Sequence, residues 1–125
     1  MSAWPDWLDE RIDMIRALEE ARGIEKHLDD NSPELEFTKQ QIAELERELE
    51  KTREETEVFL NRLYTVNCVA ASAARLRFLR GLMWKEIAYM TGKSEGSIKA
   101  RTIRAFLALN EEGTEAGEDS APPPG

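Results

Sequence analysis

Residues 84–105 read WKEIAYMTGKSEGSIKARTIRA, and the spacing within this stretch decides the fold of the C-terminal part of the chain. Ala88 is small enough for two helices to cross closely, and Gly92 follows four positions later, where a helix can end in the left-handed conformation at little steric cost. Ser94 then offers a hydroxyl that caps the next helix. The stretch therefore predicts a helix-turn-helix whose second helix runs to about Leu109.

The second predicted helix has an apolar stripe and a polar, cationic face. Ile98, Ala105, Phe106 and Leu109 recur at helical spacing and predict the buried side. The outward side is expected to hold Ser97, Lys99, Ala100, Arg101 and Arg104.

Charge is segregated along the chain. Residues 75–110 contain eight Lys/Arg against Glu86 and Glu95, a balance of +6, whereas the whole chain carries −8, which leaves −14 for the remainder. The field near a binding face is set by local charges, because salt screens distant ones within about 10 Å. The acidic total therefore does not exclude a nucleic-acid partner.

The same residues carry a resemblance to a known family. WKEIAYMTGKSEGSIKARTIRAFLAL resembles region 4 of sigma-70-type factors, especially the small extracytoplasmic-function kind, and its position at the end of a short helical chain is similar to phage late-gene regulators of the ArpU and RinA type. The resemblance covers about a third of the chain. The matching positions are Trp84, Glu86, Ile87, Ala88, Gly92, Ser94, Gly96, Ser97, Ile98, Lys99, Arg101, Arg104 and Ala105.

The resemblance implies a transcription regulator, phage or prophage encoded, that binds double-stranded promoter DNA and contacts RNA polymerase. We expect Ser97, Ala100 and Glu95 to lie near base edges. Lys85, Lys93 and Ser94 are also expected to contact DNA. The expected phosphate contacts are Lys99, Arg101, Arg104, Arg75, Arg77 and Arg80.

Two positions depart from the family pattern. Met83 stands where a capping Ser or Thr is common, and Glu95 stands near the start of the recognition helix, where basic residues are common. Glu95 either favours the positive end of the helix dipole, which we prefer, or accepts a hydrogen bond from a cytosine amino group. The chain also has no counterpart to the aromatic, basic region that melts promoters, so a complete sigma factor is not expected.

The N-terminal part predicts a helical hairpin with one long arm. A first helix starts at Pro5 and ends near Gly23, and Ser32-Pro33 opens a second one whose heptad seam continues to Ala73 without a breaker. If continuous, residues 34–72 reach about 58 Å, whereas the first helix covers about 35 Å. This difference favours a homodimer, with a monomeric antiparallel hairpin as the alternative. The predicted oligomerisation residues are Leu35, Ile42, Leu45, Leu49, Phe59 and Leu63.

These elements predict an all-α protein in three parts. Residues 1–72 form the hairpin or coiled-coil region, residues 73–110 the DNA-binding domain, and residues 111–125 an acidic, proline-rich tail. The tail has no apolar periodicity and is expected to be disordered.

Little in the sequence points to catalysis. One His, one Cys and no phosphate-cradling glycine loop predict no enzyme, no cofactor or metal, and no small-molecule substrate. Cys68 has small apolar neighbours and is expected to be buried. Without a membrane-length apolar run or a signal-peptide pattern, the protein is expected in the cytoplasm of a bacterium or an infected host.

Two other functions fit the same features. A small phage terminase subunit also combines a helix-turn-helix with an oligomerising helical region, and a ring of eight or more chains would favour it. Alternatively, the region-4-like part binds polymerase or another sigma factor and contacts DNA little, in which case salt-sensitive DNA binding should be almost absent.

Overall fold

The described part of the chain consists of helices and the connections between them, with no strand. The structure is a computed structural model, which describes the backbone of residues 3–119 and the side chains of residues 3–111. The elements are α1 (Asp6–Glu25), α2 (Pro33–Asn61), the 3-10 helix η1 (Arg62–Thr65), α3 (Cys68–Phe78), α4 (Trp84–Thr91) and α5 (Glu95–Asp119).

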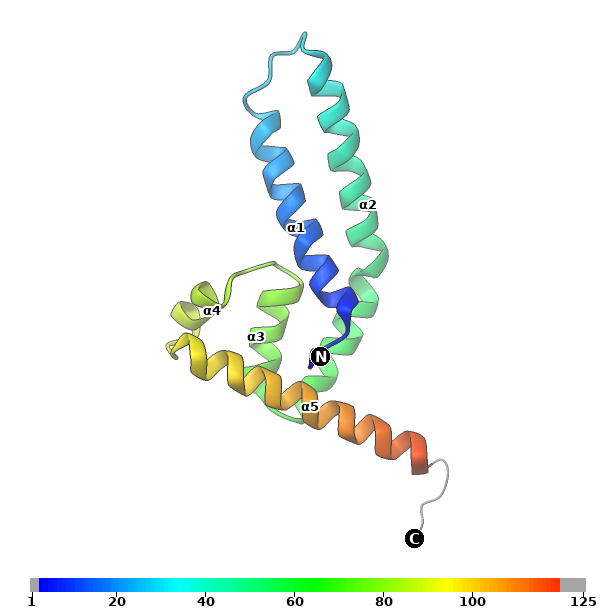
Figure 1. The fold of residues 1–125 in the computed structure, drawn as a ribbon, viewed down its shortest axis with the longest axis vertical. Helices are drawn as coiled ribbons and strands as arrows, with labels where there is room; N and C mark the ends of the chain where they lie inside the picture. Colours follow the sequence, from blue (N-terminus) through cyan, green and yellow to red (C-terminus); the bar gives the residue numbers. More distant parts are fainter. Residues whose placement is uncertain (1–2, 120–125) are drawn as a thin grey trace.

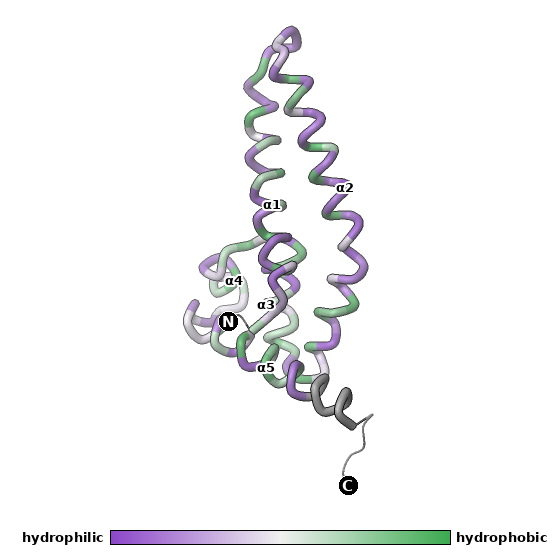
Figure 2. Tube along the Cα trace, turned by 45° about the vertical axis from the view of Figure 1, so that its right-hand side comes forward, coloured by the Kyte–Doolittle hydropathy of each residue, from purple (hydrophilic) through white to green (hydrophobic). Residues whose placement is uncertain are grey.

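Two long helices form an arm and three others form its base. Helices α1 and α2 run antiparallel as a hairpin, and α3, α4 and α5 gather where α1 begins and α2 ends (Figure 1). Coloured by hydropathy, the far end of the hairpin is mostly hydrophilic with isolated apolar positions (Figure 2). The base therefore holds most of the core, and the arm projects from it.

The second helix is shorter than the sequence predicts. It ends at Asn61, and Asn67 caps a new helix, its Oδ1 accepting a hydrogen bond from Ala70 N at 3.0 Å. The expected continuous helix from 34 to 72 is therefore wrong, because Asn67 in an extended conformation starts α3, which packs back onto α2. The predicted boundary between residues 72 and 73 falls inside α3.

The shorter helix removes the length argument for a second chain. At 1.5 Å per residue, the 29 residues of α2 extend about 44 Å and the 20 residues of α1 about 30 Å. The predicted oligomerisation residues Leu35, Ile42, Leu45, Leu49 and Phe59 are partly buried within this single chain, and Leu63 is fully buried. The homodimer stays a prediction, to be tested by a mass measurement in solution.

The main core joins the hairpin to the base. Leu8 and Ile12 of α1, Leu60 of α2, Phe78 of α3 and Phe106 of α5 belong to one buried cluster. These side chains are almost completely shielded from solvent, so their burial is the largest favourable contribution to folding. The N-terminal and C-terminal regions therefore share a core.

The N-terminal segment completes this core with one tryptophan. The ring of Trp4 lies 5.3 Å from those of Phe78 and Phe106 and 6.1 Å from that of Trp84, measured between centroids. Its indole Nε1 donates a hydrogen bond to Asp9 Oδ1 at 3.0 Å. Large aromatic side chains bury much area when they meet edge to face, so Trp4 binds three elements of the base together.

A buried arginine makes a second link between arm and base. Arg11 Nε donates to the carbonyl of Phe78 at 3.1 Å, and Nη1 donates to the carbonyl of Leu49 at 3.0 Å and to the hydroxyl of Thr52. Burial lowers the pKa of Arg11, and the nearby Glu50 carboxylate opposes that shift. One side chain thus ties α1 to both α2 and the end of α3.

The last helix extends beyond its predicted end. It continues through residues 111–119, where the sequence predicts a disordered tail. Glu and Ala favour helix, the glycines at 113 and 117 cost about 1 kcal/mol each without forbidding it, and the first proline comes only at 122. The rest of the predicted tail, residues 120–125, lies outside the described residues. Within the described part, no helix has the length and apolar character needed to cross a membrane.

Candidate nucleic-acid interface

The connection between α4 and α5 has the geometry that its sequence predicts. Gly92 ends α4 with φ 71° and ψ 19°, the left-handed conformation, and Lys93 N donates to the carbonyl of Ala88 at 3.1 Å. Ser94 Oγ then accepts a hydrogen bond from Ser97 N at 3.2 Å. Three residues, 92–94, therefore separate the two helices and satisfy backbone groups at both ends.

The start of α4 shows how the chain replaces the missing cap. Met83 has no hydroxyl to offer, but its backbone N donates to Glu86 Oε1 at 2.8 Å. This contact is half of a capping box, and the Glu86 carboxylate also lies at the positive end of the helix dipole. Glu86 thus has a structural role that orients α4.

The buried side of α5 contains the predicted apolar residues and one further residue, a threonine. Ile98, Ala105, Phe106 and Leu109 are buried as expected, and Thr102 is completely buried among them. The Thr102 hydroxyl donates to the carbonyl of Ile98 at 2.8 Å, so its burial leaves no unpaired polar atom. A threonine with this internal partner fits an otherwise apolar stripe.

The outer side of α5 is cationic at its margins. Glu95, Ser97, Lys99 and Arg104 are exposed, while Ala100 and Arg101 are half-buried. Arg101 and Arg104 line a hollow of about 330 Å³ with Val66 and Asn67. The cations on this margin of α5 therefore lie near the start of α3. Lys85 is exposed at the second position of α4, and Lys93 is half-buried in the connection.

The centre of the outer face is apolar. Gly96, Ala100, Ile103 and Leu107 repeat at spacings of four and three, opposite the buried stripe, and the Leu107 side chain is 48% exposed. None of these side chains has a hydrogen-bonding group. Polar contacts from α5 therefore have to come from the flanking residues, which are Glu95, Ser97, Lys99, Arg101 and Arg104.

The arginines of α3 are not brought together with the cations of α5. Arg75 donates from Nη1 to Asn61 Oδ1 at 2.9 Å, and its Nη2 lies 3.7 Å from Glu57 Oε2. Ala70 and Ala74 of α3 pack in the core cluster with α5, whereas Arg75 and Leu76 line a cleft towards α2. None of the residues that line this cleft belongs to α4 or α5.

Arg77 and Arg80 lie at the end of α3 and in the connection that follows it. Arg77 Nη1 donates to the carbonyl of Leu82 at 2.8 Å, and its guanidinium lies 5.5 Å from the ring centroid of Trp84. Burial lowers the pKa of Arg77, as does the neighbouring Arg16, while Asp9 raises it. Arg80 is exposed on the rim of the same cleft as Arg75. Arg77 thus braces the 79–83 connection, and Arg80 belongs to the cleft.

The remaining chemical candidates are few. Cys68 is exposed, so the expectation that it is buried is wrong. It is the first residue of α3, and the alanines of this helix fill the core in its place. Among the described residues, no group of three or more His, Cys, Asp or Glu side chains is placed to hold a metal ion.

No protein-family model matches the chain, and neither curated proteins nor solved structures gave a significant match.

Proposed function

We propose that the chain is a sequence-specific, double-stranded DNA-binding transcription regulator of a phage or prophage, acting in the bacterial cytoplasm. In this proposal α4 and α5 are a helix-turn-helix, and α5 is the recognition helix. The observation that carries the proposal is the three-residue connection 92–94, with its left-handed Gly92 and its Ser94 cap, between a short helix and a helix flanked by cations.

The geometry narrows the set of proposed phosphate contacts. Lys85, Lys93, Lys99, Arg101 and Arg104 lie on α4, α5 or their connection, and we assign these five to the DNA backbone. The three arginines at 75, 77 and 80 are left out, because they face α2, brace a connection or line the cleft. Base edges are left to Ser97, Ala100 and Glu95, all in the first two turns of α5.

The weak hydrogen-bonding capacity of the outer face has a consequence for recognition. A helix whose centre is Gly96, Ala100, Ile103 and Leu107 can approach the groove closely and contact thymine methyl groups, but it offers few donors to guanine or adenine. We therefore expect DNA-binding affinity to come mainly from phosphate contacts and sequence specificity to come from few positions of α5. A contact with RNA polymerase, which the resemblance to sigma region 4 implies, would add to promoter selection.

The test is binding to random and selected DNA over a range of salt. Five phosphate contacts predict a slope of log affinity against log salt of roughly −4.5, and Arg104→Ala should reduce its magnitude by roughly 1 while weakening all sequences alike. Ser97→Ala should instead change the order of preferred sequences. Arg16→Ala, an exposed arginine of α1, is the matched control and should leave the slope unchanged. A slope near zero for the unaltered protein would contradict DNA binding.

A second candidate function rests on exposed apolar residues of α4. The side chain of Tyr89 is 89% exposed, and its neighbour Met90 is 55% exposed. Exposed apolar side chains in one region often mark a protein-binding surface. A polymerase- or sigma-binding module would use this surface and would show little salt-dependent DNA binding, so the same titration separates the two functions.

A further inference from the structure

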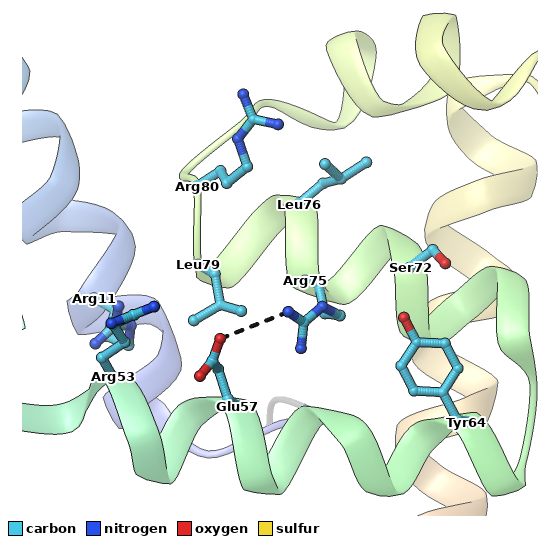
Figure 3. A pocket seen from close by; sticks show the side chains of 9 residues that line it. All are labelled: Arg11, Arg53, Glu57, Tyr64, Ser72, Arg75, Leu76, Leu79 and Arg80. Atoms are coloured by element: carbon cyan, nitrogen blue, oxygen red, sulfur yellow. Dashed lines mark ion pairs between the residues drawn. The ribbon is translucent and has the colours of Figure 1, made fainter.

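A cleft between α2 and α3 gathers arginines from four parts of the chain. It measures about 490 Å³ and is open to solvent. Figure 3 shows Arg11 and Arg53 at one end, Glu57 and Arg75 facing each other across the middle, Arg80 on the rim, and Tyr64 and Ser72 at the other end. The complete lining is Arg11, Arg53, Glu57, Tyr64, Ser72, Arg75, Leu76, Leu79 and Arg80.

This cleft is cationic within an acidic surrounding. It holds four arginines and one carboxylate, whereas α2, which forms one wall, carries nine Glu and four Lys/Arg over its whole length. A group small enough to enter the cleft meets the guanidinium groups, but a long polyanion lying across it also meets the glutamates of α2. The charge pattern therefore favours a compact anion over a nucleic-acid duplex.

The arginines of the cleft differ in how firmly they are held. Arg11 is fixed by its hydrogen bonds to backbone carbonyls, so it provides a positive charge at one end that does not move. The Arg75–Glu57 contact, at 3.7 Å, is longer than a hydrogen bond, and that from Arg53 Nη1 to Glu50 Oε2 is 3.8 Å with both partners largely exposed. An incoming anion can therefore replace Glu57 as the partner of Arg75 at small cost.

From this arrangement we infer that the cleft binds the phosphate group of a small molecule. Guanidinium groups bind phosphate oxygens in pairs of parallel hydrogen bonds, and several of them around one space suit a dianion with three or four acceptor oxygens. The hydroxyls of Tyr64 and Ser72 supply further donors, and Leu76 and Leu79 form an apolar wall for the remainder of a phosphate ester. No residue of α4 or α5 lines this site, and the inference does not depend on DNA binding.

Calorimetric titration of the full chain tests the inference, using inorganic phosphate, ribose 5-phosphate and adenosine 5′-monophosphate, each against chloride at equal ionic strength. We expect saturable binding that weakens about tenfold in Arg80→Gln and in Arg75→Gln, since each removes a charge-assisted hydrogen bond. Glu57→Gln should bind several-fold more tightly, because it removes the competing carboxylate. Tighter binding of the two esters than of inorganic phosphate identifies an ester as the ligand, and equal binding identifies phosphate itself.

Matched variants separate a loss of phosphate binding from a loss of folding and from a loss of DNA binding. Arg53 and Arg80 are exposed, so Arg53→Gln and Arg80→Gln should fold normally, as circular dichroism will show. Arg104→Gln on α5 should leave phosphate binding unchanged while weakening DNA binding, and Arg80→Gln should do the reverse. Three results would each overturn the inference. One is no saturable binding of any of the three compounds, and another is unchanged phosphate binding in the double variant Arg53→Gln/Arg80→Gln. The third is displacement of bound phosphate by a short DNA duplex.

Discussion

The base of the molecule and the far end of its hairpin bury their side chains in different ways. Phe78, Ile87, Ile98 and Phe106 of the base are completely buried and contact several helices. Beyond Arg11, the hairpin is two helices thick, and its seam residues, such as Leu45, are mostly only partly buried. We conclude that the base carries most of the stability and that the far end of the arm opens at a lower free energy than the whole molecule.

The largest expected effect is the loss of an aromatic ring at the centre of the base. Phe106→Ala removes a completely buried side chain that contacts the rings of Trp4, Phe59 and Phe78, and we expect it to cost about 3–5 kcal/mol of unfolding free energy. Leu45→Ala in the hairpin, where the side chain is only partly buried, should cost about 1–2 kcal/mol. Urea denaturation measures both. Equal losses would show that arm and base are one equally stable unit.

The next effect concerns the link between the two regions. Arg11→Met keeps an unbranched apolar stem but leaves the carbonyls of Phe78 and Leu49 without this donor, so we expect a loss of about 2–3 kcal/mol. Hydrogen exchange should show the amides of α1 and α2 losing more protection than those of α4 and α5. The control is Arg16→Met on the same helix, which is exposed and should change stability by less than about 0.5 kcal/mol.

Replacing a glycine in the base and a glycine in the hairpin by alanine tests the backbone conformation at each position without changing side-chain packing. An added Cβ would meet no atom within 4 Å at either Gly92 or Gly23. Gly92→Ala should destabilise by about 1 kcal/mol, because its φ of 71° is unfavourable for alanine. Gly23→Ala in helix α1 should stabilise by about 0.5–1 kcal/mol. Thermal unfolding distinguishes the opposite signs, and a stabilising Gly92→Ala would contradict the left-handed conformation.

The same contrast explains how much could be predicted from the sequence. Gly92 and Ser94 act on backbone groups a few residues away, so the α4–α5 connection was readable from local spacing. The break before α3 could not be predicted from apolar spacing. Leu63 and Ala70 continue the heptad spacing and are both buried, although they lie on different helices. Apolar spacing indicates which residues are buried, and the only local sign of the break is the helix-capping residue Asn67.

The contacts that join distant segments could not be predicted at all. Arg11 meets its acceptors 38 and 67 residues away, and Arg75 meets Glu57 across a break between helices that the sequence pattern does not predict. A charged residue on an amphipathic helix ordinarily indicates a solvated face, so nothing near Arg11 marks it as buried. The sequence therefore groups the cationic residues by position in the chain, whereas in the structure Arg75 and Arg80 line the cleft, Arg77 contacts the 79–83 connection, and the other cations lie on α4, α5 or the connection between them.

The smallest expected effect lies at the far end of the hairpin, where α2 begins. Ser32 Oγ accepts a hydrogen bond from Glu34 N at 3.2 Å and donates to the Glu34 carboxylate. The bond from Ser32 to the carboxylate, and next the backbone N–H of Glu34, lower the pKa of Glu34. A lowered pKa stabilises the folded state above the unfolded pKa, and this stabilisation is lost as the pH falls through the folded value. Ser32→Ala should raise the pKa of Glu34 in a carboxyl NMR titration, and the stability difference between variant and unaltered protein should shrink in acid. Ser72→Ala, an exposed serine of the base, should leave Glu34 unchanged. An unshifted Glu34 in Ser32→Ala would mean that this end of the hairpin is open in solution, which would widen the contrast between arm and base.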